Sequence, residues 1–397
     1  MTEPNKNYAN LKDSYLFFRI AEKVKKYSET HPDKKILRLG IGDVSLPLTK
    51  SVIAALNGAV KEQAEKSTFH GYMPECGAPF LRTVIAEFYR GRGVNIANDE
   101  VFVSSGASDE LGDILDLFGK ENSALVIEPA YPAYVDANII AGRKIIHLPS
   151  SEKDGFTPLP DEKFTADIIY LCSPNNPTGA VFTKDKLKKW VDFANAHGSV
   201  ILFDAAYEAF IEESDVPHSI FEIDGAKTCA IEICSLSKTA GFTGTRLGYT
   251  VIPKTLVRQG MCFNGMWVRN RTTKTNGVSY IIQKGGAAVF TEEGQREIKE
   301  NIAYYKENAK ILMRVLDECG IEYTGGKNAP YIWLKCPRGL DSWAFFDLLL
   351  NEIQVVGTPG EGFGSCGEGF FRFSTFGSRE DTLEAADRLK SLFGKGL

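Results

Sequence analysis

The sequence has no apolar run that approaches the length of about 18 residues a membrane helix needs, and its N-terminus has no apolar signal core. It also has no surplus of positive charge, because 46 Lys and Arg stand against 51 Asp and Glu, a net charge of −5. Nucleic-acid-binding proteins usually carry a basic surplus or stripe. We therefore expect a cytoplasmic protein that binds neither membrane nor nucleic acid.

The eight cysteines and five histidines are scattered along the chain. No C-x-x-C pair and no H-x-x-x-H pair occurs, although metal ribbons and disulfide frameworks need such spacing. We expect mostly buried, reduced thiols and no bound metal. A chain of 397 residues, 43% of them hydrophobic, can bury a large core and needs no disulfide or metal to stabilise it. We therefore expect a globular enzyme of two or three domains.

Short apolar segments alternate with helical patterns between about residues 101 and 252. The expected strands are VFVSS, ALVIEP, KIIHLP, DIIYLCSP, SVILFD, AIEICS and GYTVIP. The clearest helix between them is TKDKLKKWVDFANAHG, with apolar residues at Leu187, Trp190, Val191 and Ala194. This alternation predicts an α/β fold with a mainly parallel, seven-stranded sheet that helices cover on both faces. Ligands bind such sheets beyond the carboxyl ends of the strands.

The chain after about residue 291 has a different character. A helical stretch of roughly 40 Å comes first, followed by the strands YIWLKC, QVVGT and GFFRFSTF and by a closing helix that Ser378 would cap. We predict a large domain at 46–290 and a smaller α+β domain from 1–45 and 291–397. Residues 362–367 match G-x-G-x-x-G, but a strand follows where a dinucleotide site needs a helix, so we expect a glycine loop.

Polar residues follow most of the predicted strands, and together they suggest one chemistry. They are Gly106, Ala107, Ser108, Tyr131, Asn176, Asp204, Tyr207, Ser235, Ser237, Lys238 and Arg246. A pyridoxal phosphate enzyme needs a lysine for the cofactor aldehyde and a carboxylate for the pyridine nitrogen. It also needs a phenol and an amide for the ring hydroxyl, an aromatic cover, and a helix start with hydroxyls and an arginine for the phosphate. The set meets every requirement.

The chain resembles the fold-type I pyridoxal phosphate aminotransferases over nearly its whole length. Within that class it is similar to the LL-diaminopimelate aminotransferase family. The segments that carry the resemblance are SYLFFRIAEKV, LRLGIGDVSLPL, GYMPECGAPFLR, LCSPNNPTGA, SKTAGFTGTRLGYTVIPK, TGGKNAPYIWL and GEGFFRFSTFGSRE. The resemblance implies a homodimer that moves an amino group between glutamate and the tetrahydrodipicolinate/LL-diaminopimelate pair, in lysine biosynthesis.

The resemblance also implies a role for each residue. Lys238 would hold the cofactor and shuttle protons, Asp204 would pair with the ring nitrogen, and Tyr207 and Asn176 would bond the ring hydroxyl oxygen. Tyr131 would stack on the ring. The phosphate would be bound by the following set: Gly106, Ala107, Ser108, Ser235, Ser237, Arg246, and Tyr72 of the partner subunit.

Substrate recognition is implied in the same way. Arg372 would bind the α-carboxylate, with Gly42, Tyr131 and Asn176 beside it. The residues expected near the distal end of a long substrate are Tyr15, Tyr72, Glu75 and Asn276, of which Glu75 would provide an anion for the second ammonium group.

The sequence departs from the family pattern at one position, and several alternative functions remain open. Plant-type members have a lysine after the Gly-Ala pair, where this chain has Ser108 and Asp109, so the contacts of that loop are in doubt. An aromatic, alanine or aspartate aminotransferase, or a pyridoxal phosphate β-lyase, would use the same scaffold. A regulator that binds the cofactor without turnover is the remaining alternative, from a different class.

Overall fold

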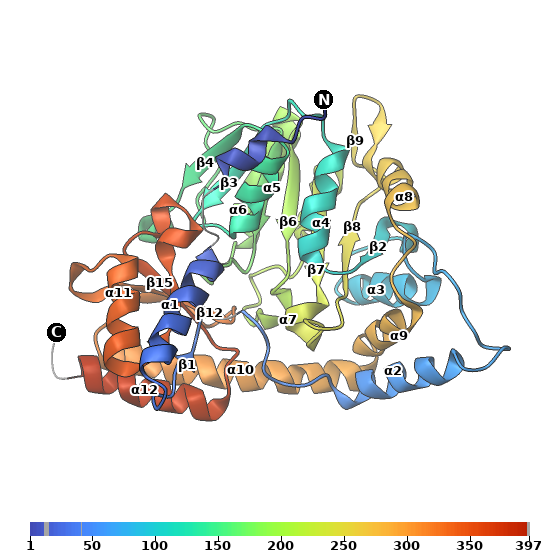
Figure 1. The fold of residues 1–397 in the computed structure, drawn as a ribbon. Helices are drawn as coiled ribbons and strands as arrows, with labels where there is room; N and C mark the ends of the chain where they lie inside the picture. The colour runs from blue at the N-terminus through green and yellow to red at the C-terminus, as the bar shows by residue number, and fades with distance from the viewer. Residues whose placement is uncertain (12–15, 41, 395–397) are drawn as a thin grey trace.

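A seven-stranded sheet forms the centre of the computed structural model, which describes residues 1–11, 16–40 and 42–394 (Figure 1). Its strands are β2 (Val101–Ser104), β3 (Ala124–Glu128), β4 (Ile145–Pro149), β5 (Ile168–Cys172), β6 (Val200–Asp204), β7 (Ala230–Ser235) and β8 (Gly248–Val251). They lie in the order β2-β8-β7-β6-β5-β3-β4, and β8 runs in the direction opposite to the other six. The seven predicted strands and the mainly parallel sheet are confirmed.

Apolar side chains cover both faces of this sheet, because its inner strands are apolar at nearly every position. Ile169 and Phe203 face one core, which also contains Trp190 of α6 (Lys184–His197). Their neighbours Ile168 and Leu202 face the other core. Successive side chains of a strand point to opposite faces, so an uninterrupted apolar strand needs a helical layer on each side.

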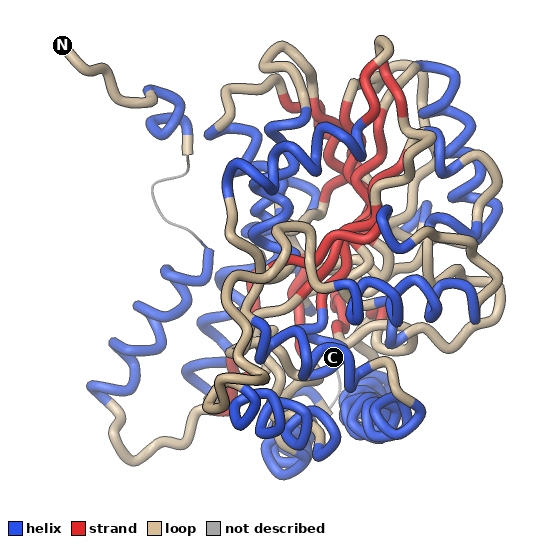
Figure 2. Tube along the Cα trace, turned by 90° about the vertical axis from the view of Figure 1, so that its right-hand side faces the viewer, coloured by secondary structure: helices blue, strands red, loops and turns tan. Residues whose placement is uncertain are grey.

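The helices of this part of the chain form those two layers. They are α2 (Lys50–Glu62), α3 (Pro79–Gly91), α4 (Ala107–Asp113), α5 (Pro132–Ile140), α6, α7 (Leu236–Ala240), α8 (Phe263–Lys274) and α9 (Tyr280–Val289). Figure 2 shows the twisted sheet with helices on either side. The predicted helix α6 is confirmed: the Thr183 hydroxyl accepts a hydrogen bond from the Lys186 amide at its start, and Gly198, with φ 71°, ends it.

A second, four-stranded sheet lies beside the first and is built mainly from the C-terminal part of the chain. Its strands, in the order β11-β12-β15-β14, are β11 (Tyr323–Gly325), β12 (Tyr331–Lys335), β15 (Phe370–Ser374) and β14 (Thr358–Pro359). The helices around it are α1 (Leu16–Thr30), α11 (Ser342–Leu348) and α12 (Arg379–Phe393). The N-terminal part joins through β1 (Leu37–Arg38), which pairs in parallel with β13 (Val355–Val356). The domain limits 46–290, and 1–45 with 291–397, stay a prediction.

The long helix α10 (Glu292–Glu318) connects the two parts along one side of the molecule (Figure 1). Near its start, Glu297 accepts hydrogen bonds from the amide and hydroxyl of Ser51 in α2. Near its middle, Asn308 donates to the carbonyl oxygens of Thr375 and Gly377, just after β15. Its 27 residues correspond to about 40 Å, the length expected from the sequence.

The remaining sequence predictions concern loops and thiols. The glycine segment 362–367 lies in two short 3-10 turns, Gly360–Phe363 and Ser365–Gly367, and a strand, β15, follows it, as expected. A small hairpin is formed by β9 (Val257–Arg258) and β10 (Met261–Cys262). All eight cysteines are unpaired, and five of them are buried. Among the described residues, no helix combines the length and apolarity needed to cross a bilayer.

Candidate active site

A cavity of about 480 Å³ opens at the carboxyl edge of the large sheet, where the small sheet faces it. A volume of this size holds a cofactor together with a small substrate. The sequence-predicted residues that line it are Gly42, Ala107, Ser108, Tyr131, Asn176, Asp204, Tyr207, Ser235, Ser237, Lys238, Arg246 and Arg372. The alternating pattern of strands and polar residues therefore brings most of the predicted set to one place.

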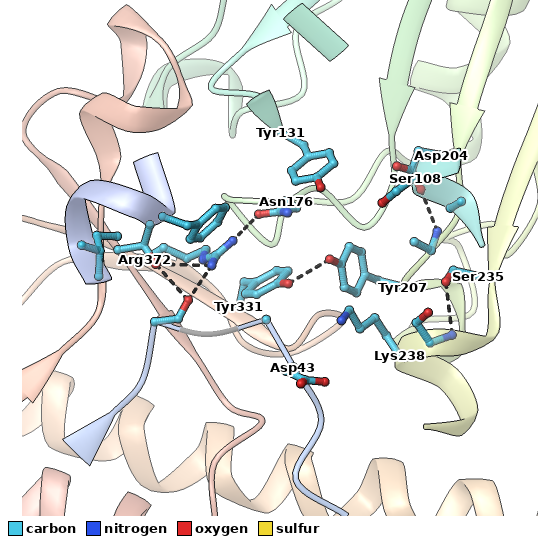
Figure 3. A pocket seen from close by; sticks show the side chains of 18 of the residues that line it. Asp43, Ser108, Tyr131, Asn176, Asp204, Tyr207, Ser235, Lys238, Tyr331 and Arg372 are labelled. Atoms are coloured by element: carbon cyan, nitrogen blue, oxygen red, sulfur yellow. Dashed lines mark hydrogen bonds between the residues drawn. The ribbon is translucent and has the colours of Figure 1, made fainter. Parts of the chain in front are cut away.

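Lys238 enters the cavity from α7, a short helix that begins directly after β7 (Figure 3). The Ser235 hydroxyl accepts a hydrogen bond from the Ser237 amide at the helix start. Burial lowers the pKa of the Lys238 amine to about 8; the nearby charge of Asp43 opposes this shift, while those of Arg246 and Arg372 add to it. A lowered pKa leaves more of the amine neutral near pH 7, which a nucleophilic lysine requires.

Asp204 is the last residue of β6 and is buried at the inner end of the cavity. One carboxylate oxygen accepts a hydrogen bond of 2.6 Å from the Tyr134 hydroxyl, and the other accepts one of 3.0 Å from the Ala206 amide. Burial raises the pKa of Asp204, and these two hydrogen bonds oppose the rise. A buried carboxylate held in this way is suited to pair with a cationic ring nitrogen.

Tyr207 and Asn176 supply the phenol and the amide, and both are buried. The Tyr207 hydroxyl lies 2.8 Å from the hydroxyl of Tyr331. The Asn176 side-chain oxygen accepts a hydrogen bond of 2.6 Å from Arg372, which leaves its NH₂ group as the donor. Asn176 can therefore donate to an oxygen in the cavity, and Tyr207 can do so when Tyr331 is the donor of their shared hydrogen bond.

The start of α4, Arg246 and the α7 hydroxyls lie together in a corner suited to bind an anion; we call it the anion-binding corner. Gly106, with φ 128°, precedes α4, and a side chain at this position would collide with the guanidinium of Arg246. Arg246 in turn donates a hydrogen bond of 3.1 Å to the Ser237 hydroxyl. Asp109, part of the departure from the plant-type pattern, accepts a hydrogen bond from Ser105 in the first turn. Backbone amides, hydroxyls and an arginine are the groups that bind phosphate.

Arg372 lies at the small-sheet side of the cavity, in the middle of β15, and is only 1% exposed. Besides Asn176, it donates to the Gly40 carbonyl oxygen at 2.8 Å and to the Thr358 hydroxyl at 3.3 Å (Figure 3). Within the described residues its Nε atom has no hydrogen-bond partner. A buried guanidinium that only neutral groups hydrogen-bond is suited to an anionic ligand such as a carboxylate.

Five predicted residues are not among those that line this cavity: Gly106, which lies directly before the lining residue Ala107, and Tyr15, Tyr72, Glu75 and Asn276. Tyr72 is 89% exposed, Asn276 is exposed and Glu75 is half-buried. Their two loops are adjacent, since a Cβ atom on Gly277 would lie 2.8 Å from the carbonyl oxygens of Met73 and Pro74. Tyr15 lies outside the described residues.

The sequence patterns missed about half of the cavity lining, including the polar residues Tyr134, Tyr331 and Asp43. Tyr134 lies one helical turn after Tyr131, and that spacing could have indicated a shared side. Tyr331 stands in TGGKNAPYIWL and Asp43 in LGIGDVS, two segments that carried the family resemblance without a role for either residue.

The fold and this cavity define a pyridoxal phosphate-dependent transferase of fold type I. The chain belongs to the family of class I and II aminotransferases, whose family model matches residues 34–389. Enzymes of this family depend on pyridoxal phosphate, and the cavity fits that cofactor: it offers a lysine amine, a buried carboxylate and an anion-binding corner. The chain is thus an aminotransferase.

Individual proteins that are similar to this chain belong to one group within the class I and II aminotransferases. LL-diaminopimelate aminotransferase of Lachnospira eligens is 51% identical over 406 residues, which cover 99% of this chain and 100% of the relative. That of Lawsonia intracellularis is 50% identical, with 98% of this chain and 99% of the relative covered. The solved L,L-diaminopimelate aminotransferase of Chlamydomonas reinhardtii has a TM-score of 0.93 and 41% identity, with 99% of each chain covered.

Proposed function

We propose that this protein interconverts LL-2,6-diaminopimelate plus 2-oxoglutarate and tetrahydrodipicolinate plus L-glutamate, a step of lysine and diaminopimelate biosynthesis. The observation that carries the proposal is the identity of about half of all residues, over the full length, with relatives named for this activity. Pyridoxal phosphate carries the amino group between the substrates and withdraws electrons from their α-carbon.

Three residues would do the chemistry at the cofactor. The Lys238 amine, with its pKa lowered to about 8, would hold the cofactor and then move a proton to and from the substrate's α-carbon. Asp204 would keep the ring nitrogen protonated, aligned by the Tyr134 hydroxyl. Tyr207 would donate to the ring hydroxyl oxygen together with Asn176.

The other residues would hold the two ends of the bound molecules. Gly106, Ala107, Ser108, Ser235, Ser237 and Arg246 would bind the phosphate. Tyr131 would cover the ring. Arg372, whose hydrogen-bond partners among the described residues are all neutral, would take the substrate's α-carboxylate, with Asn176 and Gly42 beside it.

We further propose a homodimer in which Tyr72 reaches the phosphate, and Glu75 and Asn276 the distal end of the substrate, of the partner's site. The exposure of Tyr72, at 89%, supports this, since a large aromatic side chain so open is suited to an interface. Tyr15 would join the same distal group. A cytoplasmic location completes the proposal, because eight unpaired thiols suit a reducing compartment.

Hybrid dimers test the shared site. A chain with Lys238→Ala and a chain with Tyr72→Ala should each be weakly active or inactive alone. Mixing them after mild unfolding places one intact Lys238 and one intact Tyr72 in the same site, so about a quarter to a half of the wild-type activity should return, counting one restored site in each hybrid dimer. If refolded mixtures gain no activity although hybrid dimers are present, Tyr72 does not act across the interface.

Replacing Glu75 with glutamine tests the proposed distal contact. The variant removes an anion that would face the second ammonium group, so kcat/KM for LL-diaminopimelate should fall about 10- to 100-fold, whereas kcat/KM for glutamate should change less than about threefold. The exposed Glu65→Gln is the matched control and should affect neither substrate. Equal losses with both substrates would argue against a role for Glu75 in substrate choice.

A panel of amino donors separates this proposal from the alternatives that share the scaffold. LL-diaminopimelate, an aromatic amino acid, alanine and aspartate are each supplied with 2-oxoglutarate, and a sulfur amino acid is tested for release of ammonia and pyruvate. Glutamate should form fastest from LL-diaminopimelate. Faster turnover of an aromatic amino acid, alanine or aspartate, or release of ammonia and pyruvate, would replace the proposed substrate with that alternative.

A further inference from the structure

Tyr331 occupies a position between the two halves of the proposed active site, and none of the roles above uses it. It is 1% exposed, lines the cavity from the start of β12, and its hydroxyl lies 2.8 Å from that of Tyr207. Its ring packs under Arg372, whose Cζ atom is 4.4 Å from the ring centroid. Figure 3 shows it between Tyr207 on one side and Arg372 on the other.

The Tyr207–Tyr331 hydrogen bond raises a question of direction, because each hydroxyl has a single proton. If Tyr207 donates to Tyr331, it has no proton left for an oxygen in the cavity. If Tyr331 donates to Tyr207, the Tyr207 proton is free to point into the cavity. The role proposed for Tyr207 requires the second arrangement.

The surroundings of Tyr331 favour it as the donor. Burial raises the pKa of both phenols, and the Arg372 guanidinium opposes the rise for each. Arg372 lies against the ring of Tyr331 itself, with its Cζ atom 4.4 Å from the ring centroid. A cation against the ring face draws electron density from the phenol, which makes the Tyr331 hydroxyl the better donor.

Gly42 provides the room that this arrangement needs. A Cβ atom at position 42 would lie 2.7 Å from the Tyr331 hydroxyl oxygen, which is closer than such atoms approach. Within the described residues, this hydroxyl shares its hydrogen bond with Tyr207. The phenol therefore fits closely between Gly42 and Tyr207 and is directed at Tyr207.

We propose that Tyr331 is a positioning residue: its hydroxyl donates to Tyr207, so that the Tyr207 proton is directed to the cofactor's ring hydroxyl oxygen, and its ring seats Arg372. This inference rests on the proposed function, specifically on the role of Tyr207. With the cofactor bound, a donor to the ring oxygen would stabilise the neutral form of the nitrogen that joins Lys238 to the cofactor. Through Tyr207, Tyr331 would therefore lower the pKa of that nitrogen.

Spectrophotometric titration of the cofactor-loaded enzyme, without substrate, tests the role proposed for the Tyr331 hydroxyl. The visible absorption of the lysine-bound cofactor changes with protonation, so its pKa is read directly. Tyr207→Phe should raise this pKa by about one unit or more, the worth of a hydrogen bond to a charged group. Tyr331→Phe should raise it by about 0.1 to 0.5 units, because a second bond strengthens the first by roughly 10–30%. In the Tyr207→Phe background, Tyr331→Phe should add nothing.

Each other outcome points to a different failure. A fall, or no change, in Tyr331→Phe while Tyr207→Phe gives its rise overturns the inference and leaves the proposed function standing. No change in Tyr207→Phe means that the proposed role of Tyr207 fails, and the inference with it. Tyr170→Phe, which removes another buried phenol hydroxyl outside the cavity, is the matched control and should leave the titration unchanged.

The contact between the Tyr331 ring and Arg372 is tested separately through the KM for glutamate. Tyr331→Phe retains the ring and should change KM less than about twofold. Tyr331→Leu removes the face that contacts Arg372 and should raise KM about 5- to 30-fold, the range of a buried cation–π contact. An unchanged KM in a folded, cofactor-loaded Tyr331→Leu protein would show that the Tyr331 ring does not position Arg372.

Discussion

Replacing Lys238 with alanine is expected to reduce transamination at least about 10⁴-fold, the largest effect of any single change in this chain. The amine lies in the cavity with a pKa lowered to about 8 and is the amine proposed to hold the cofactor and to move the proton. Steady-state kinetics with purified variant measure the loss. Borohydride treatment should fix the cofactor to the wild-type chain and leave the variant unmodified, as seen by mass spectrometry.

The exposed Lys189→Ala serves as the control for this experiment, because it removes a lysine from the surface of α6, away from the cavity. It should retain wild-type activity and covalent attachment. A Lys238→Ala protein that turns over within about tenfold of the wild type would contradict the proposed mechanism.

Replacing Asp204 with asparagine is expected to reduce kcat about 10²- to 10³-fold. The change keeps the shape of the side chain but removes the buried charge proposed to keep the ring nitrogen protonated, and breaking such a pair costs about 2–5 kcal/mol. The KM for glutamate should change little, because Arg372 binds at the other side of the cavity (Figure 3). Initial rates over a range of glutamate concentrations separate the two constants.

Asp192→Asn makes the same chemical change at an exposed site of α6, where the carboxylate forms an ion pair with Lys188. Its kcat should equal that of the wild type. If Asp204→Asn keeps kcat within about threefold while the cofactor remains bound, the carboxylate is not needed to activate the ring.

The large sheet could be predicted from the sequence because its inner strands are apolar at nearly every position. Ile168–Cys172 and Val200–Asp204 are buried at every position, so no other element competes with a strand buried on both faces. The predicted cofactor residues came together for a related reason, since the carboxyl ends of parallel strands share one edge.

The rest of the site depends on contacts between distant segments. Arg372 reaches Asn176 and Gly40, which are 196 and 332 residues away in the chain, and no local pattern specifies these pairs. Tyr331 is similar, because its partner Tyr207 is 124 residues away. Sequence spacing could place each residue on its element but could not reveal which side chains from different elements meet.

The most direct test of the proposed activity is the formation of glutamate from 2-oxoglutarate with LL-diaminopimelate, measured beside the meso isomer. Recognition of both ends of the substrate predicts rapid glutamate formation from the LL isomer. It predicts at least about tenfold slower formation from the meso isomer, whose second centre has the opposite configuration. Activity on neither isomer, in a cofactor-loaded protein that transaminates another amino acid, would contradict the proposed substrate.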